Sequence, residues 1–293
     1  MNDPTRPMSK WLPPAGAILA GAAMALFAGR RREEARAQDL VEALLHAVPT
    51  CLGGSVDFAS FAALPAPVAR YFWRALTDGQ PLVRCLRMRQ TGELRTGTRS
   101  RRWAPFTACQ IVVPAAPGFV WDARVALPLA GHVRVLDSYR AGIGAGRVSL
   151  LSAFAVMAAS GAPELASGAL HRYLAEAVWT PTALLPASGV RWTAIDDRTA
   201  LATLADRGAT VSLEFRFDAA DDVVGIHSPG RFARVDGGYR QMPWQGRFGS
   251  HALRAGMRVP TEGDVGWFDR GAWETVWRGR LVDARYEFAS AGI

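Results

Sequence analysis

The stretch TVSLEFRF, residues 210–217, alternates apolar and polar side chains without a break. Successive side chains of a β-strand point to opposite faces, so Val211, Leu213 and Phe215 would share one face. Half-buried strands of this kind are typical of antiparallel sheets, which pack one face on a core and expose the other to water. This stretch therefore predicts a β-rich fold.

Short segments bounded by Gly, Pro and Asp continue the pattern on both sides of this strand. The predicted strands cover residues 83–94, 102–113, 118–127, 132–140, 190–195, 200–204, 210–217, 223–226, 231–235, 244–253 and 275–288, with a first turn at 95–101. Two predicted helical stretches, at residues 150–159 and 163–178, interrupt them. Strands and helices do not alternate regularly, which disfavours a doubly wound parallel sheet. We predict a mainly β (α+β) fold, a curved antiparallel sheet or half-barrel of about ten strands with a helical lid.

The glycine-rich stretch GIGAG, residues 142–146, has the composition of a phosphate-binding loop. A dinucleotide site requires the spacing Gly-x-Gly-x-x-Gly between a strand and a helix. Here the third glycine comes one residue early, and no βαβ unit follows. We therefore expect a flexible turn before a helix that begins at Leu150, and we predict no cofactor.

Residues 12–28 form an uncharged run rich in Ala, Leu, Gly and Met, and three arginines follow it at residues 30–32. A helix over this run would span about 26 Å, slightly less than the hydrocarbon core of a bilayer. A single-pass anchor in a bacterial inner membrane is the favoured interpretation, and a cleaved signal peptide and a buried helix are the alternatives. Because more basic residues follow the run than precede it, the cytoplasmic side is slightly favoured for the rest of the chain, with the periplasm left open.

The chain divides into three predicted parts. Residues 1–32 hold the N-terminal tail and the membrane anchor, and residues 33–80 form a helical linker module. Residues 81–293 form the antiparallel β-rich domain, with a helical insertion at 150–180. The linker module begins with a helix whose apolar stripe comprises Leu40, Val41, Leu44 and Leu45.

The composition predicts a folded core and excludes several classes of site. Of the 293 residues, 49% are apolar, which is enough to bury a core. The net charge of +8 comes almost entirely from arginine, but no helix-turn-helix, finger or stacking-strand motif accompanies it, so nucleic acid is not a predicted partner. The spacing of the three cysteines and five histidines fits no metal motif, and we predict no metal site.

The segment LHRYLAE, residues 170–176, reads as an amphipathic helix that carries an ion pair. Arg172 and Glu176 are separated by four residues, which places them on one helical face. The modest interpretation is an intrahelical ion pair. The functional interpretation is that the helix presents Glu176 to a cavity, where burial would raise its pKa for acid–base work. No second carboxylate can be paired with Glu176 from the sequence.

Tryptophan is abundant on the predicted strands, which favours either a packed core or a cavity for an apolar ligand. The leading hypothesis is binding of a lipid or another apolar ligand without catalysis. The predicted ligand-binding residues are Trp121, Tyr139, Tyr173, Trp179, Trp192 and Trp244, with Arg172 and Glu176 as polar contacts. An enzyme that uses Glu176 and a structural or interaction module are the alternatives.

Several fragments of the sequence resemble an uncharacterised bacterial membrane-associated family, a domain of unknown function. They are LPxPVxRYF at 64–72, QxGE at 90–93, WxPFxAxQ at 103–110, FxWxA at 119–123, RYLxExxWxPTALLP at 172–186 and VxWxxID at 190–196. The resemblance covers about residues 60–290 and implies no activity.

A second, more distant resemblance comes from the order of strands, a helical segment and further strands, which is similar to the LolA-like half-barrel of lipoprotein carriers. That resemblance implies a lipid-sized apolar cavity under a helical lid. It also implies a periplasmic location, which conflicts with the orientation that the basic residues favour.

Overall fold

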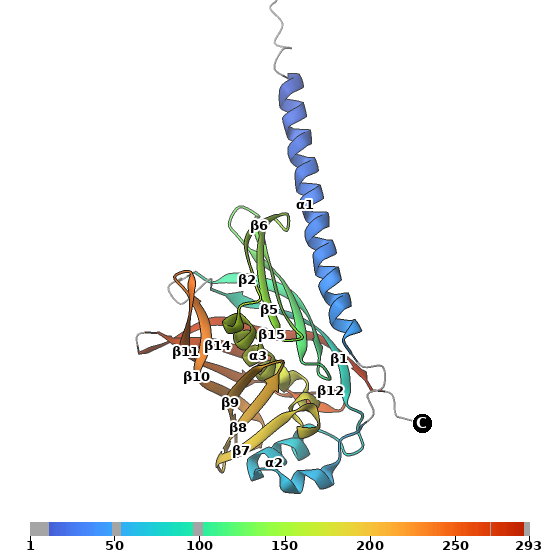
Figure 1. The fold of residues 1–293 in the computed structure, drawn as a ribbon, viewed down its shortest axis with the longest axis vertical. Helices are drawn as coiled ribbons and strands as arrows, with labels where there is room; N and C mark the ends of the chain where they lie inside the picture. The colour runs from blue at the N-terminus through green and yellow to red at the C-terminus, as the bar shows by residue number, and fades with distance from the viewer. Residues whose placement is uncertain (1–11, 49–53, 96–101, 270, 290–293) are drawn as a thin grey trace, which may run out of the picture.

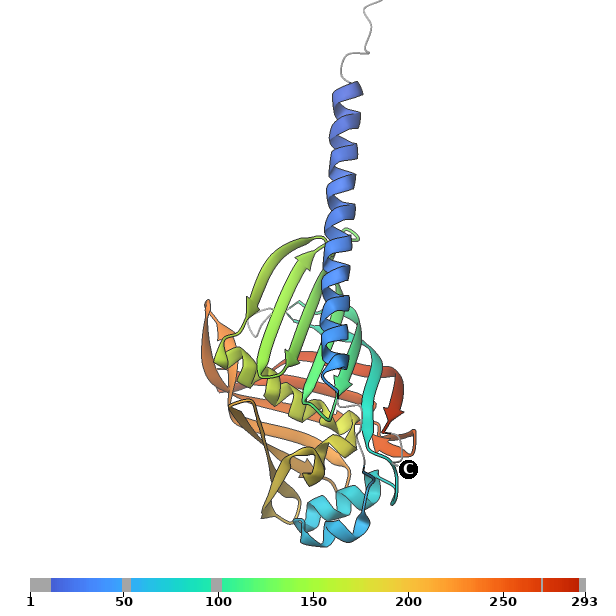
Figure 2. The same cartoon turned by 45° about the vertical axis from the view of Figure 1, so that its right-hand side comes forward.

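The structure is a computed structural model that describes residues 12–48, 54–95, 102–269 and 271–289. Most of the turn predicted at residues 95–101 lies outside this range, as does Cys51. Figures 1 and 2 show a strongly curved sheet with a long helix, α1, along one side.

The sheet contains thirteen strands, all paired antiparallel, in the order β6-β5-β4-β3-β2-β1-β15-β14-β11-β10-β9-β8-β7. Their bounds are β1 Val83–Leu94, β2 Ala104–Val113, β3 Gly118–Ala126, β4 His132–Arg140, β5 Ile143–Leu150, β6 Phe154–Ser160, β7 Val190–Asp196, β8 Thr199–Asp206, β9 Ala209–Phe217, β10 Val223–Val235, β11 Gly238–Gly249, β14 Glu262–Asp269 and β15 Ala272–Phe288. A separate hairpin pairs β12 (Ala252–Arg254) with β13 (Met257–Val259). The predicted mainly β, curved antiparallel fold is confirmed, but the estimate of about ten strands was too low.

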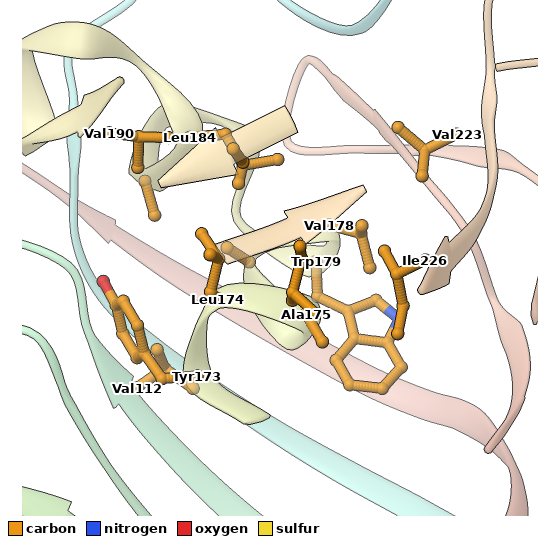
Figure 3. Close-up of a cluster of buried hydrophobic side chains, with 14 of the residues drawn as sticks. Val112, Tyr173, Leu174, Ala175, Val178, Trp179, Leu184, Val190, Val223 and Ile226 are labelled. Atoms are coloured by element: carbon orange, nitrogen blue, oxygen red, sulfur yellow. The ribbon is translucent and has the colours of Figure 1, made fainter. Parts of the chain in front are cut away.

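The concave face of the sheet holds the core. Helix α3 (Pro163–Glu176) and the 3-10 turns η3 (Ala177–Trp179), η4 (Pro181–Leu184) and η5 (Pro186–Ser188) occupy the concavity. Figure 3 shows Leu174, Val178 and Leu184 packed between strands from both halves of the sheet, and all three are fully buried. The predicted helical lid is thus a helix packed inside the concavity. The lower end is closed by η2 (Phe58–Ala63) and α2 (Ala66–Ala75).

Helix α1 runs without a break from Leu12 to His46, across the predicted end of the anchor at residue 32. Its C-terminal part packs on the convex face, where Leu44 and Ala37 are buried against Val120 and Leu136. The apolar stripe predicted for this helix therefore faces the sheet. The N-terminal part projects beyond the sheet (Figures 1 and 2). Among the described residues, no helix combines the length and apolar character needed to cross a membrane.

The helix predicted at residues 150–159 is wrong, because these residues belong to the hairpin of β5 and β6. The segment is almost uniformly apolar, so neither the helical nor the strand period stands out in it. The glycine-rich stretch is likewise mostly strand β5, and only its first residue, Gly142 at φ +83°, lies in the turn. A Cβ at Gly144 would lie 2.6 Å from the carbonyl oxygen of Leu165, so this glycine permits close packing of α3 on β5.

Candidate functional site

A polar cluster lies between α3 and the concave face of β2–β5. The Nε atom of Arg172 donates to Oε1 of Glu176 at 2.7 Å, and its Nη1 atom donates to Oδ2 of Asp137 at 3.0 Å. The guanidinium also lies over the rings of Phe119 and Trp121, at 5.0 and 4.8 Å from their centroids. The i,i+4 spacing on α3 therefore does form the predicted ion pair, and the fold adds a second carboxylate to it.

The strand register explains why these groups meet. Gln110, Trp121, Asp137 and Gly146 are direct partners across β2, β3, β4 and β5. Directly paired residues of adjacent strands project from the same face of a sheet. We call this set the polar row. Because Gly146 has no side chain, the Asp137 carboxylate lies over it, with Oδ1 3.2 Å from where a Cβ would be.

One buried acceptor in the polar row has no partner. The Nε2 atom of Gln110 donates to Oε2 of Glu176 at 2.6 Å, which fixes the orientation of the amide, because a carboxylate can only accept. The Oε1 atom of Gln110 is buried and accepts no hydrogen bond from any described residue. A buried acceptor without a donor is costly, so this atom marks a position that a donor from water or a ligand would occupy.

A second arginine lies next to the cluster. Arg231 of β10 donates from Nε and Nη2 to the carbonyl oxygen of Gly168 at 3.1 and 2.9 Å. Its guanidinium lies 4.5 Å from the ring centroid of Trp244 and 5.1 Å from that of Trp267. Burial, reinforced by the nearby charge of Arg172, lowers the pKa of Arg231 to about 10, so it stays cationic at neutral pH.

The charges of the cluster balance. Arg172 and Arg231 face the carboxylates of Glu176 and Asp137. Burial opposes the charge of Arg172, but the two carboxylates outweigh it and raise its pKa. Loss of solvent around Asp137 raises the pKa of that carboxyl, and Arg172 offsets only part of this effect. Both oxygens of Glu176 already accept hydrogen bonds, one from Arg172 and one from Gln110.

The polar row is reached along an apolar surface. The next two rows of the concave face place Val135 beside Val148 and Met157, and Val133 beside Leu150 and Phe154. We call these six residues the apolar track. Met157, Leu150 and Phe154 are 40%, 38% and 46% exposed, and the three valines are half-buried. The side chain of Asp137, where the track meets the polar row, is 36% exposed.

The predicted ligand-binding residues are thus only partly brought together. Trp121, Arg172 and Glu176 belong to the cluster, and Trp244 stacks on Arg231 beside it. Tyr139 of β4 and Tyr173 of α3 are both buried, with their hydroxyls bonded to Asp206 (2.7 Å) and the carbonyl of Pro114 (3.4 Å) respectively.

Two predicted residues lie in other packing contacts. The indole of Trp179 donates to the carbonyl of Pro260 at 3.0 Å, and that of Trp192 donates to the carbonyl of Leu184 at 2.9 Å. Trp192 also packs edge-on against Phe215, far along the sheet from β3. Their role in ligand binding stays a prediction.

Three residues of the cluster were not among the predicted site residues: Gln110, Asp137 and Arg231. Gln110 ends the fragment WxPFxAxQ, which carries the family resemblance, and this is the one signal that the sequence offers. Asp137 and Arg231 reach the site through strand pairing, which a single sequence does not reveal. Within the described residues, no group of three or more His, Cys, Asp or Glu side chains is placed to hold a metal ion.

Comparison with protein families gives one match that covers most of the chain. The model of a family of unknown function, DUF6920, matches residues 62–286. The chain belongs to this family. The resemblance to an uncharacterised family is therefore confirmed. Because the function of the family is unknown, membership assigns no activity to this chain. No curated protein matches the chain.

Solved structures give weaker similarities. A LolA superfamily protein from Nitrosomonas europaea is 11% identical, with 80% of this chain and 94% of that chain covered and a TM-score of 0.40. A beta-barrel-like protein of the domain of unknown function DUF1849 from Brucella abortus is also 11% identical, with 71% and 100% covered and a TM-score of 0.22. Neither similarity bears on what this DUF6920 member binds.

Proposed function

We propose that this DUF6920 member is tethered to a membrane and binds an amphipathic, lipid-like ligand on the concave face of β2–β6. The apolar part of the ligand lies on the apolar track, and its polar head reaches the polar row. The observation that carries this proposal is an exposed apolar surface that ends at the accessible carboxylate of Asp137, in a polar row whose Gln110 has a buried, unpartnered Oε1 atom. Such a combination of apolar lining with a few convergent polar groups is typical of ligand sites.

The polar row favours a head group that donates hydrogen bonds. Arg172 is already paired with two carboxylates, so it offers little to an added anion. The free acceptors are Oε1 of Gln110 and the accessible carboxylate of Asp137. A hydroxyl or ammonium group can donate to either one, because these groups donate to carbonyl and carboxylate oxygens.

The projecting part of α1 supports the tether. Its large apolar side chains Ile18, Leu19, Met24 and Phe27 are 65–71% exposed. Exposed apolar side chains in a continuous run mark a surface that another apolar phase covers. The uncharged run at residues 12–28 and the arginines that follow it fit a lipid phase with an anionic border.

The alternative of an enzyme that uses Glu176 is less well supported. An acid–base residue must exchange a proton with its substrate, so it needs an oxygen that the substrate can reach. Both Glu176 oxygens are engaged, at 2.7 and 2.6 Å. Glu176 is better placed to orient Arg172 and Gln110.

Native mass spectrometry of the full chain, released from detergent after incubation with a bacterial lipid extract, tests the proposal. The wild type is expected to carry a lipid-sized mass that denaturation releases. Met157→Asp puts a carboxylate on the apolar track and should lower the loaded fraction. Ile195→Asp makes the same change at a 51% exposed residue of β7 and should leave it unchanged. An unloaded wild type, or equal loading of all three proteins, would overturn the proposal.

A further inference from the structure

Two hairpin tips at one end of the sheet expose apolar side chains to solvent. The turn between β3 and β4 carries Leu127, which is 37% exposed, and Leu129, which is fully exposed. The turn between β5 and β6 is flanked by Leu150 and Phe154, at 38% and 46% exposure. Both tips lie at the same end because β3 and β5 run toward it and β4 and β6 run away from it. We call these four side chains the apolar rim.

Helix α1 holds this end of the sheet in place. The Nε atom of Arg30 donates to the carbonyl oxygen of Leu151 at 3.1 Å. Gly29 lies so close to the same turn that a Cβ would be 2.7 Å from the carbonyl oxygen of Ala153. The ion pair of Glu33 with Arg147, at 2.7 and 2.8 Å, fixes the next turn of α1 on the convex face. The turn between β5 and β6 is therefore level with residues 29–30, where the uncharged run ends.

Arginine side chains surround the same level. Arg30, Arg31 and Arg32 are exposed on α1, and exposed Arg124 lies across the convex face. Arg30 and Arg124 line a groove of about 630 Å³ between α1 and the sheet. The groove also contains Arg134, but Asp122 and Glu34 pair with it at 2.6 and 3.2 Å. Arg124 bonds only an uncharged group there, Nδ1 of His132 at 3.2 Å, so its positive charge is not neutralised by that contact.

We propose that the apolar rim docks on the surface of an anionic bilayer, with the hairpin tips in the interface and the arginines at the phosphate groups. The inference rests on the tether proposed above, because α1 fixes the rim at the level where its uncharged run ends and its arginines begin. Apolar side chains beside arginines suit this interface, since the former enter the acyl boundary and the latter attract anionic lipid. Leu150 and Phe154 belong to both the rim and the apolar track. Docking therefore opens the track directly onto the membrane, so a lipid reaches the polar row without crossing water.

Depth-dependent fluorescence quenching on the full chain tests this docking. A Cys51→Ser, Cys109→Ser background leaves Cys85, which is buried and whose pKa burial raises to about 11, so it reacts little. An environment-sensitive dye is attached at Leu129→Cys or at Leu253→Cys. Leu253 is 68% exposed on β12, away from the apolar rim (Figure 1). Each protein is reconstituted into phosphatidylcholine vesicles with or without phosphatidylglycerol, and nitroxide-labelled lipid is the quencher.

The dye at residue 129 is expected to be quenched several-fold more than the dye at residue 253, and more strongly in anionic vesicles. Arg124→Gln should reduce the effect of phosphatidylglycerol and leave binding of the chain to vesicles unchanged. Equal quenching at residues 129 and 253, in a chain that does float with the vesicles, would overturn rim docking and leave the tether intact. A chain that does not float with vesicles at all would overturn the tether and the docking together.

Discussion

The two ends of the thirteen-stranded sheet use the same alternating pattern for different purposes. At the β7–β9 end, the concave residues Ala202, Leu213 and Phe215 are fully buried beneath α2, α3 and the 3-10 turns. At the β4–β6 end, Val135 and Val148 stay half-buried, and Phe154 is 46% exposed. Alternation alone therefore shows which residues share a strand face, but not whether that face is buried in the core or exposed. The helices decide which face becomes core and which stays open to a ligand.

The closed end should be far less tolerant of substitution than the open end. Phe215→Ala removes a fully buried ring that contacts Trp192, and it should lower the free energy of unfolding by about 3–5 kcal/mol. Met157→Ala, on the open end, should cost less than about 1 kcal/mol, because its side chain is 40% exposed. Urea unfolding of both variants measures the difference. Similar losses for both would mean that the open end is also core.

Acid should lower the stability of the fold through His171 of α3. This residue follows Leu170 and precedes Arg172, but its side chain faces β10. Its ring contacts the carbonyl of Ser167 at 2.9 Å, and burial lowers its pKa from 6.5 to about 4. A depressed histidine pKa means that the unfolded chain binds a proton first as the pH falls. Stability from this residue is thus present above pH 6.5 and is lost between pH 6.5 and about 4, by about 3 kcal/mol.

The control for this pH effect is His171→Gln, which cannot ionise. Unfolding free energies of both proteins, measured from pH 7 to pH 4, should diverge because the wild type loses more stability. Parallel pH profiles would show that His171 is not buried as described, whatever the absolute stability of the variant.

The contact of α3 with β5 separates the closed core from the apolar track, and it depends on one glycine. Gly144→Ala places a methyl group 2.6 Å from the carbonyl oxygen of Leu165, so we expect a loss of about 1–3 kcal/mol. Gly249→Ala is the matched control, because nothing lies within 4 Å of its Cβ position. Thermal unfolding should distinguish the two variants. Equal melting temperatures would contradict the close packing of α3 on the sheet.

The smallest effect on stability, and the most specific effect on binding, is expected at the polar row. Asp137→Asn keeps the shape of the side chain but removes the charge that would attract a donating head group. We expect a change in unfolding free energy within about 1 kcal/mol, because the side chain is 36% exposed. The loaded fraction in native mass spectrometry should fall, most clearly for ammonium-bearing lipids. Unchanged loading would place the head group elsewhere.

The strands were largely predictable where one face is buried and the other is exposed to solvent. Residues 83–94 and 132–140 were predicted with the bounds that the structure has, because glycine or proline lies close outside each end. Strand β10 was read as two strands, since Pro229 and Gly230 interrupt it, but the sheet absorbs the interruption as a register shift between Ser228 and Arg231. Strand β5 was missed because its glycines were read as a turn, and β6 was missed because its residues are almost all small or apolar, so no alternation shows.

The candidate site was predictable only where it is local in sequence. The Arg172–Glu176 pair follows from helical spacing, whereas Asp137 meets Arg172 across 35 positions of the chain. That contact requires the register of β3, β4 and β5, which one sequence does not specify. The place of Gly146 beside Asp137 also depends on this register, so the same glycines were read as a turn.

Photocrosslinking in intact membranes tests ligand binding on the concave face most directly. A photoreactive phenylalanine analogue is placed at Met157 on the apolar track or at Ile195 on the closed end, where both positions are exposed. Mass spectrometry of the irradiated full chain should find a lipid adduct at residue 157 and none at residue 195. No lipid adduct at residue 157, or adducts of equal yield at both positions, would contradict the proposed ligand site.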